Sequence, residues 1–129
     1  MTQATFFPVA GCTGTDHRLA GDYHHRWMVI DVQGEWLTPL ACPKLSEVTV
    51  DLKMGALVLR APGMLRMDIP LDVIEDDESV NRPATIAGQP VVVIDEGEVA
   101  AVWFSKALGQ SCRFVKIRPD KKQPVWPQG

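Results

Sequence analysis

His25-Arg26-Trp27-Met28-Val29-Ile30-Asp31 and Gln33-Gly34-Glu35-Trp36-Leu37-Thr38 are two runs rich in apolar residues, separated by a short turn that contains glycine. Glycine adopts a positive φ angle without steric cost, and tight turns between two strands need such an angle. The pattern therefore predicts a β-hairpin whose strands are residues 25–32 and 35–38.

Short runs of strand-forming residues recur between turn residues along most of the chain, at the spacing typical of a sandwich or a barrel. Besides the hairpin, we expect strands at residues 4–8, 47–52, 56–60, 65–70, 84–86, 91–95 and 113–117. The fold class that follows is mostly β, a β-barrel or barrel-like antiparallel sandwich, with one short helix near the C-terminus.

The expected helix runs from about residue 96 to 108. Asp95 can cap its N-terminus, and Gly109 stands where a left-handed residue ends a helix. Four residues at helical spacing form an apolar stripe that we expect to pack against the sheet: Val99, Val102, Trp103 and Ala107.

Length and composition indicate one globular domain. The chain has 129 residues, 46% of them hydrophobic and 22% charged, with a formal charge of −3 and a pI near 5.5. This negative net charge does not favour nucleic acid as a partner.

No apolar run approaches the roughly 20 residues that span a bilayer, and the N-terminus lacks the pattern of a signal peptide. We therefore expect a cytoplasmic protein without a membrane partner.

No motif for catalysis or metal binding emerges from the sequence. Cys12, Cys42 and Cys112 have no metal-binding or disulfide spacing, and we expect buried, reduced thiols. Adjacent strand residues point to opposite faces, so His24 and His25 are not expected to face one site. The acidic run 75–79 lacks the spacing of a calcium loop and is expected to be a solvated loop. Neither His17 nor the carboxylates of Asp68, Asp72 and Asp95 form a recognisable catalytic set with other residues.

The chain resembles the MOSC N-terminal β-barrel domain, the module that precedes the MOSC domain in molybdenum-cofactor sulfurase-like and amidoxime-reducing proteins. The matching positions keep the family's order and approximate spacing: Pro8-Val9, Cys12, Gly14, Arg26 to Asp31, Gly34, Leu37-Thr38, Pro43-x-Leu45, Leu59-x-Ala61-Pro62-Gly63-Met64, Asp95-x-Gly97, Trp103-x-Ser105, Leu108-Gly109 and Arg113-x-Val115. The resemblance covers about residues 5–117. We expect the domain at 1–117 and a proline-rich linker or tail at 118–129.

The resemblance implies a phosphate contact that this sequence has altered. In cofactor-binding relatives, a Lys-Ser pair and an arginine reach the phosphate of the molybdenum cofactor, but this chain has Ala10-Gly11 and His25 at those positions. The polar stretch after Leu-Thr is replaced by Pro39-Leu40-Ala41. Either cofactor contact has been lost, or Arg26 and the backbone near Gly11 substitute for it. The candidate cofactor-binding residues are accordingly Arg26, His25 and Gly11.

The expected function is that of a non-catalytic accessory domain. It would pack on a MOSC domain, supplied in cis or in trans, and line that domain's cofactor or substrate cleft. We expect no cofactor and no enzymatic activity in this chain alone, although a full-length parent could bind the molybdenum cofactor and act as an oxidoreductase or sulfurtransferase. The alternative is a stand-alone module that binds a small anion or a protein partner.

Overall fold

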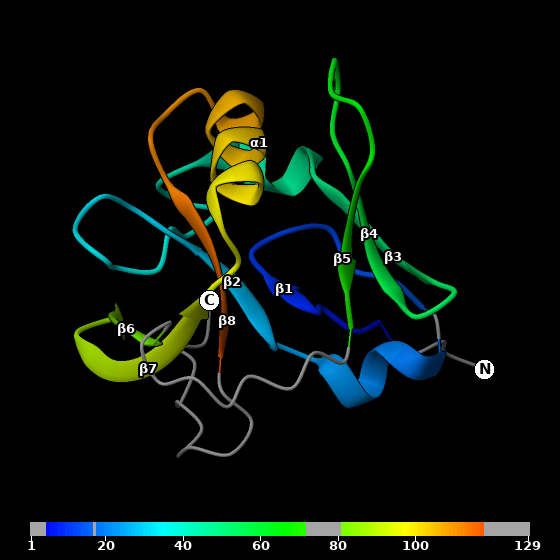
Figure 1. The fold of residues 1–129 in the computed structure, drawn as a ribbon, viewed down its shortest axis with the longest axis horizontal. Coiled ribbons are helices and arrows are strands. Elements are labelled where there is room, and N and C mark those ends of the chain that lie inside the picture. The colour runs from blue at the N-terminus through cyan, green and yellow to red at the C-terminus, as the bar shows by residue number, and fades with distance from the viewer. Residues whose placement is uncertain (1–4, 17, 72–80, 118–129) are drawn as a thin grey trace.

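The computed structural model describes residues 5–16, 18–71 and 81–117, which form two sheets, one α-helix and two 3₁₀ helices (Figure 1). The five-stranded sheet has the order β1 (Val9–Ala10), β2 (Trp27–Ile30), β8 (Arg113–Ile117), β7 (Gln89–Asp95) and β6 (Asn81–Ile86). The three-stranded sheet has the order β3 (Thr49–Lys53), β4 (Ala56–Arg60) and β5 (Met67–Pro70). The helices are η1 (Arg18–Tyr23), η2 (Pro43–Glu47) and α1 (Glu98–Leu108).

The mostly β, barrel-like sandwich with one helix near the C-terminus is confirmed. β1 pairs with β2 in parallel, and the other strand pairs are antiparallel. Isolated bridges join Trp36 to Ile30 of β2 and Glu35 to Thr85 of β6. These bridges bring one edge of the five-stranded sheet back toward its centre, so the sheet curls without closing into a continuous barrel.

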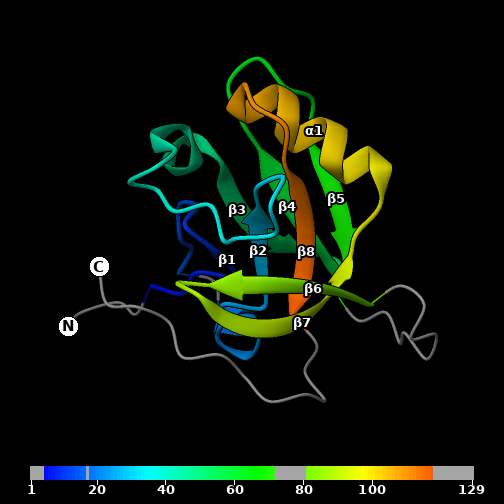
Figure 2. The ribbon, with the colours of Figure 1, turned by 90° about the vertical axis from the view of Figure 1, so that its left-hand side faces the viewer.

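β2 is apolar without alternation because both of its faces are buried. Trp27 and Val29 face a core shared with the three-stranded sheet, α1 and Phe114 of β8. Met28 and Ile30 face a second core between β6, β7 and β8. In Figure 2, α1 crosses β8 at one end of the molecule, with the three-stranded sheet behind them. A strand with two buried faces reads as an apolar run, which is the pattern of residues 27–30.

The predicted hairpin is confirmed, and its turn is held by one carboxylate. Asp31 Oδ1 accepts hydrogen bonds from the backbone N–H groups of Gln33 at 2.8 Å and Glu35 at 3.1 Å. Gly34 has a φ of +87°, and its N–H donates to the carbonyl of Asp31 at 3.0 Å. The residues after the turn form bridges rather than the predicted strand 35–38.

The prediction for the buried face of the helix was wrong for Val99 and Val102 but is confirmed for Trp103 and for Ala107, which packs against the core. Val99 is 81% exposed and Val102 is 50% exposed, whereas Trp103 is buried as expected. The other buried residues of α1 are Ala100, Ala101, Phe104 and Leu108. Two small alanines let the helix lie close to its neighbours, and this turns the two valines outward.

Several boundaries also differ from the prediction. The helix begins at Glu98 rather than 96, because Asp95 still belongs to β7 and Gly97 occupies the N-cap position. The left-handed end at Gly109 is confirmed. The strand expected at 4–8 is found at Val9–Ala10, and the one expected at 47–52 begins after η2. Strands 56–60 and 113–117 have the predicted bounds.

Other predictions lie outside the described residues: those for His17, Asp72, the acidic run 75–79 and the tail 118–129. Within the described ranges, no helix has both the length and the apolar character needed to cross a lipid bilayer.

Candidate functional site

His25 lies just before β2 in a strained backbone conformation. Its φ is +54°, and its N–H donates to the carbonyl of Phe7 at 2.8 Å. Its ring stacks on that of His24 with centroids 3.9 Å apart. Burial, and then the neighbouring His24, lower the pKa of His25 to about 4. The imidazole is therefore neutral near pH 7 and does not replace the positive charge of an arginine.

Arg26 is engaged with its own chain. Its guanidinium lies 5.4 Å from the centroid of the Tyr23 ring, and Nη2 donates to the carbonyl of Asp22 at 3.1 Å. Tyr23 in turn stacks on Trp27, with centroids 6.0 Å apart. These contacts fix the guanidinium at the end of η1 and leave Arg26 half-buried.

Gly11 lies at the other end of the β1–β2 pair. In the parallel register Val9 stands opposite Trp27, so Gly11 follows the pair while His25 and Arg26 precede it. At about 3.3 Å per residue, this separates Gly11 from Arg26 by roughly 10 Å along the strands. The structure brings His25 and Arg26 together as chain neighbours but does not bring Gly11 to them.

Gly11 also has a structural reason to be glycine. Its φ is +103°, a backbone conformation that residues with a side chain rarely adopt, although a Cβ atom there would make only ordinary contacts, at 3.4 Å to Pro39 Cδ and 3.5 Å to Leu45 Cδ1. Gly11 lies apart from His25 and Arg26 along the strands. The assignment of these three residues to the phosphate of a molybdenum cofactor held by another domain stays a prediction.

A recess that contains charged side chains lies elsewhere, between the hairpin turn, β6, α1 and the start of β8. We call it the α1 groove, and its volume is about 650 Å³. Its lining residues are Asp31, Val32, Arg82, Glu98, Ala101, Val102, Ser105, Lys106, Gly109, Gln110, Ser111, Cys112 and Arg113. Volumes of roughly 300–1,000 Å³ are typical of small-ligand sites.

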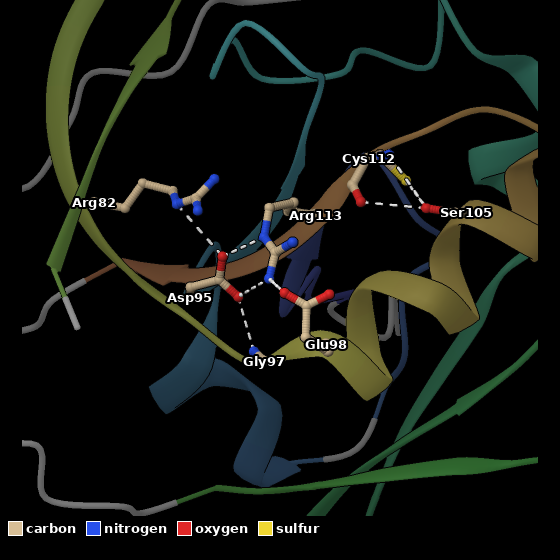
Figure 3. A network of polar contacts seen from close by, with 7 residues as sticks. All are labelled: Arg82, Asp95, Gly97, Glu98, Ser105, Cys112 and Arg113. Carbon is tan, nitrogen blue, oxygen red and sulfur yellow. Dashed lines mark hydrogen bonds and ion pairs between the residues drawn. The ribbon is translucent and has the colours of Figure 1, made fainter.

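A network of four charged side chains lies beside the α1 groove (Figure 3), and three of them, Arg82, Glu98 and Arg113, line it. Arg113 donates to both carboxylate oxygens of Asp95, from Nε to Oδ2 and from Nη2 to Oδ1, and Nη2 also reaches Glu98 Oε1 at 2.9 Å. Arg82 Nε lies 3.4 Å from Asp95 Oδ2. Asp95 further accepts the N–H of Gly97 at 2.8 Å, which ties the network to the start of α1.

The ion pairs hold these groups in their charged forms. Burial alone would raise the pKa of Asp95, but the hydrogen bonds from Arg113 and from the Gly97 N–H outweigh it, and the pKa lies below its ordinary value. Hydrogen bonds to Asp95 and Glu98 raise the pKa of Arg113. The Arg113 guanidinium is therefore a permanent cation in the wall of the groove.

Cys112 also lines the α1 groove. The Ser105 hydroxyl accepts the Cys112 N–H at 3.2 Å and lies 3.3 Å from the Cys112 carbonyl, which joins the end of α1 to the start of β8. Burial raises the pKa of the Cys112 thiol, and burial followed by Cys42 raises the pKa of Cys12 to about 12. All three cysteines are free and buried, as predicted, and the thiols of Cys12 and Cys112 are protonated near pH 7.

Within the described part of the chain, no three histidine, cysteine, aspartate or glutamate residues lie close enough to hold a metal ion. The paired carboxylates considered from the sequence also find separate partners. Asp68 bonds to Arg66 at 2.8 Å, whereas Asp95 belongs to the network in the groove.

Sequence reasoning missed the pairing of Arg82 and Arg113 with Asp95. A signal was present, since Asp95 ends one predicted strand and Arg113 begins another. Antiparallel pairing of those strands places an end beside a start, as the register Asp95 to Val115 shows. Nothing in the sequence identified these two strands as neighbours.

The comparison with protein families identifies the module. The model of the MOSC N-terminal beta barrel domain matches residues 2–111. The chain belongs to this family. The MOSC N-terminal family assignment agrees with the resemblance described from the sequence and with the barrel-like sandwich.

Relatives of this MOSC N-terminal chain include much longer proteins. It is 30% identical to the molybdenum cofactor sulfurase of Danio rerio in an alignment of 129 positions that covers 93% of this chain and 16% of that protein. It is 27% identical to the human molybdenum cofactor sulfurase in an alignment of 96 positions that covers 73% of this chain and 11% of that protein. The chain thus spans about a sixth or less of the length of these relatives.

A solved structure of similar extent also matches. The solution structure of a protein of Bordetella bronchiseptica, determined as a structural genomics target, is 49% identical, with a TM-score of 0.85, over 98% of each chain. That protein has nearly the same extent as this chain, and its structure was determined in solution.

Proposed function

We propose that this chain is a non-catalytic accessory module that packs against a MOSC domain, in cis or in trans, and forms one wall of its cofactor or substrate cleft. The observation that carries the proposal is the outward position of two valines on α1. Val99 and Val102 are three residues apart and share one face of the helix. Solvent-exposed apolar side chains that gather in one place mark interaction surfaces.

Two further exposed apolar residues flank that helix face. Val32, which is 78% exposed, lines the α1 groove together with Val102. Leu65, which is 88% exposed, is held beside the helix because Trp103 Nε1 donates to its carbonyl at 2.7 Å. We name these four exposed residues, Val32, Leu65, Val99 and Val102, the apolar band.

A MOSC domain is the occupant that the relatives favour. The Danio rerio protein contains the matched region as 16% of its length, so in that protein the module is covalently joined to a much larger remainder. An apolar band beside a groove of ligand size suits a module that contributes one wall of a shared cleft. In this proposal, the molybdenum cofactor and any sulfurase chemistry belong to the assembled protein and not to this chain alone.

To test this proposal, this chain is mixed with the MOSC domain of a molybdenum cofactor sulfurase, and their association is measured by sedimentation velocity. We expect a complex that Val99→Asp and Val102→Asp weaken by about tenfold or more, because each places a charge in an apolar interface. Met54→Asp is the matched control, since Met54 is fully exposed at the β3–β4 turn, away from α1. Absence of a complex, or equal loss with Met54→Asp, would overturn the proposal.

Arg26→Ala tests the cleft assignment separately. If Arg26 contacts a cofactor held by the MOSC domain, this variant should lower retention of cofactor by the complex while its circular dichroism spectrum stays unchanged. Full retention would remove Arg26 from the cleft and leave docking through α1 intact.

A further inference from the structure

Arg82 and Arg113 come from different strands but converge on the same carboxylate oxygen. The Nε atoms of both arginines contact Oδ2 of Asp95, at 3.4 Å for Arg82. Figure 3 shows the two guanidinium groups on either side of this carboxylate, and both arginines line the α1 groove. Asp95 thus holds two cations side by side in a recess of ligand size.

Several donors of these two groups have no partner among the residues that the structure describes. A guanidinium has five N–H groups. Arg82 uses only Nε, and Arg113 uses Nε and Nη2, in the contacts found within the described ranges. The terminal nitrogens of Arg82 and Nη1 of Arg113 remain for a ligand. Paired guanidinium groups match the geometry of an anion with several oxygens, such as a phosphate.

We propose that the α1 groove binds a small phosphomonoester, whose phosphate accepts hydrogen bonds from the terminal nitrogens of Arg82 and from Nη1 of Arg113 beside the Asp95 carboxylate, and whose organic part lies along the wall formed by Val32, Ala101 and Val102. This extends the proposed cleft wall, on which it rests, by naming a ligand class. The groove requires no second domain to form, so the ligand can be tested on this chain alone. The lining holds three cations, Arg82, Lys106 and Arg113, and two carboxylates, Asp31 and Glu98. The Asp31 carboxylate already accepts two backbone N–H groups of the hairpin turn.

Glu98 opposes the binding of this ligand. Its side chain is 81% exposed, yet its carboxylate is bound to Arg113 Nη2 at 2.9 Å. Asp95 is different, because its side chain is only 15% exposed and it also accepts the Gly97 N–H. A phosphate at Nη1 of Arg113 is therefore repelled by the exposed Glu98 carboxylate on the same guanidinium, while Asp95 stays in place. Removal of the Glu98 charge should strengthen phosphate binding.

The experiment titrates inorganic phosphate and phenyl phosphate into the isotope-labelled chain at low ionic strength and follows backbone amide shifts by NMR. We expect saturable shifts at Arg82, Val102 and Ser111, with phenyl phosphate binding more tightly than inorganic phosphate because its ring contacts the apolar wall. Arg82→Gln should weaken binding about tenfold, and Glu98→Gln should strengthen it about threefold.

Arg66 and Asp68 supply matched controls, because they form an exposed ion pair at 2.8 Å outside the groove. Arg66→Gln and Asp68→Asn make the same changes in charge and should leave phosphate binding unchanged. Shifts that do not saturate, or controls that act as strongly as the groove variants, would overturn the site. Either result would leave docking through α1 untouched, since no MOSC domain is present.

Discussion

Trp27 and Glu96 are 69 residues apart in the sequence, yet Nε1 of the Trp27 indole donates a hydrogen bond of 2.7 Å to Oε2 of Glu96. Trp27 is fully buried at the start of β2, and Glu96 lies between β7 and α1. The N–H of Glu96 also donates to the carbonyl of Phe114 at 3.0 Å. One residue thus satisfies a buried indole and fixes the chain where it leaves the sheet for the helix.

Loss of that acceptor should destabilise the fold. Glu96→Ala leaves the buried indole N–H without its partner, so we expect the free energy of unfolding to fall by about 1–3 kcal/mol. Glu96→Gln keeps an acceptor oxygen, so it should lower the free energy of unfolding by less. Urea unfolding followed by tryptophan fluorescence measures both, with the exposed Glu47→Ala as control. Equal stability of Glu96→Ala and Glu47→Ala would show that the bond contributes nothing.

The two faces of α1 should respond differently to truncation. Trp103→Ala removes a buried side chain and its hydrogen bond to the Leu65 carbonyl, and we expect it to lower the free energy of unfolding by about 3–5 kcal/mol. Val99→Ser changes an exposed position, so its free energy of unfolding should stay within about 0.5 kcal/mol of the wild-type value. Thermal unfolding by calorimetry distinguishes them. A large loss with Val99→Ser would restore the original prediction that Val99 packs against the sheet.

The turn between β3 and β4 should be open to stabilisation. Its two residues, Met54 and Gly55, have φ angles of +50° and +79°, the combination that favours asparagine before glycine. Met54 is fully exposed, so no packing is lost on replacement. We expect Met54→Asn to raise the free energy of unfolding by about 1 kcal/mol. Met54→Val should lower it, because a β-branched residue tolerates this conformation poorly, and identical melting temperatures would contradict the argument.

His25 should make stability depend on pH. Its pKa is about 4 in the fold against an ordinary 6.5, so between these values the unfolded chain binds a proton that the folded chain does not. Stability is therefore full above pH 6.5 and falls as the pH is lowered toward 4. The ring is only half-buried, and solvent screening limits the loss to about 1–2 kcal/mol.

His25→Asn is the variant that isolates this effect, because asparagine accepts a positive φ and does not titrate in this range. Urea unfolding at pH 7 and pH 5 should show a smaller difference for the variant than for the wild type. Carboxylates titrate in both proteins, so the comparison cancels their contribution. Parallel pH profiles would remove His25 as the cause.

The candidate site shows how far sequence reasoning reaches. Asp95, Arg113 and Glu98 were each visible as charged residues near element ends, but their mutual pairing needed the neighbour relation of β7 and β8. His25 was predicted to contact the cofactor phosphate because it stands where cofactor-binding relatives have an arginine. Its burial and its stacking on His24, which keep it neutral, come from the contacts made at the start of β2.

The sequence by itself determined what depends on local backbone chemistry. The turn with Gly34 after β2, the left-handed end of α1 at Gly109 and the strand at Ala56–Arg60 all follow from preferences of a few adjacent residues. Such preferences act wherever the segment lies, because they arise from sterics and short-range hydrogen bonds.

Only the tertiary structure decided which side of an element is buried and which charges meet. Apolar residues occupy more than one face of α1, and the face with Ala100 and Phe104 is buried rather than the one with Val99 and Val102, because small residues allow close packing on β8. The same packing brought Arg82 and Arg113 to one carboxylate. Burial and pairing depend on neighbours that are remote in sequence, so the apolar pattern around residues 25–38 specified a hairpin but not the groove above it.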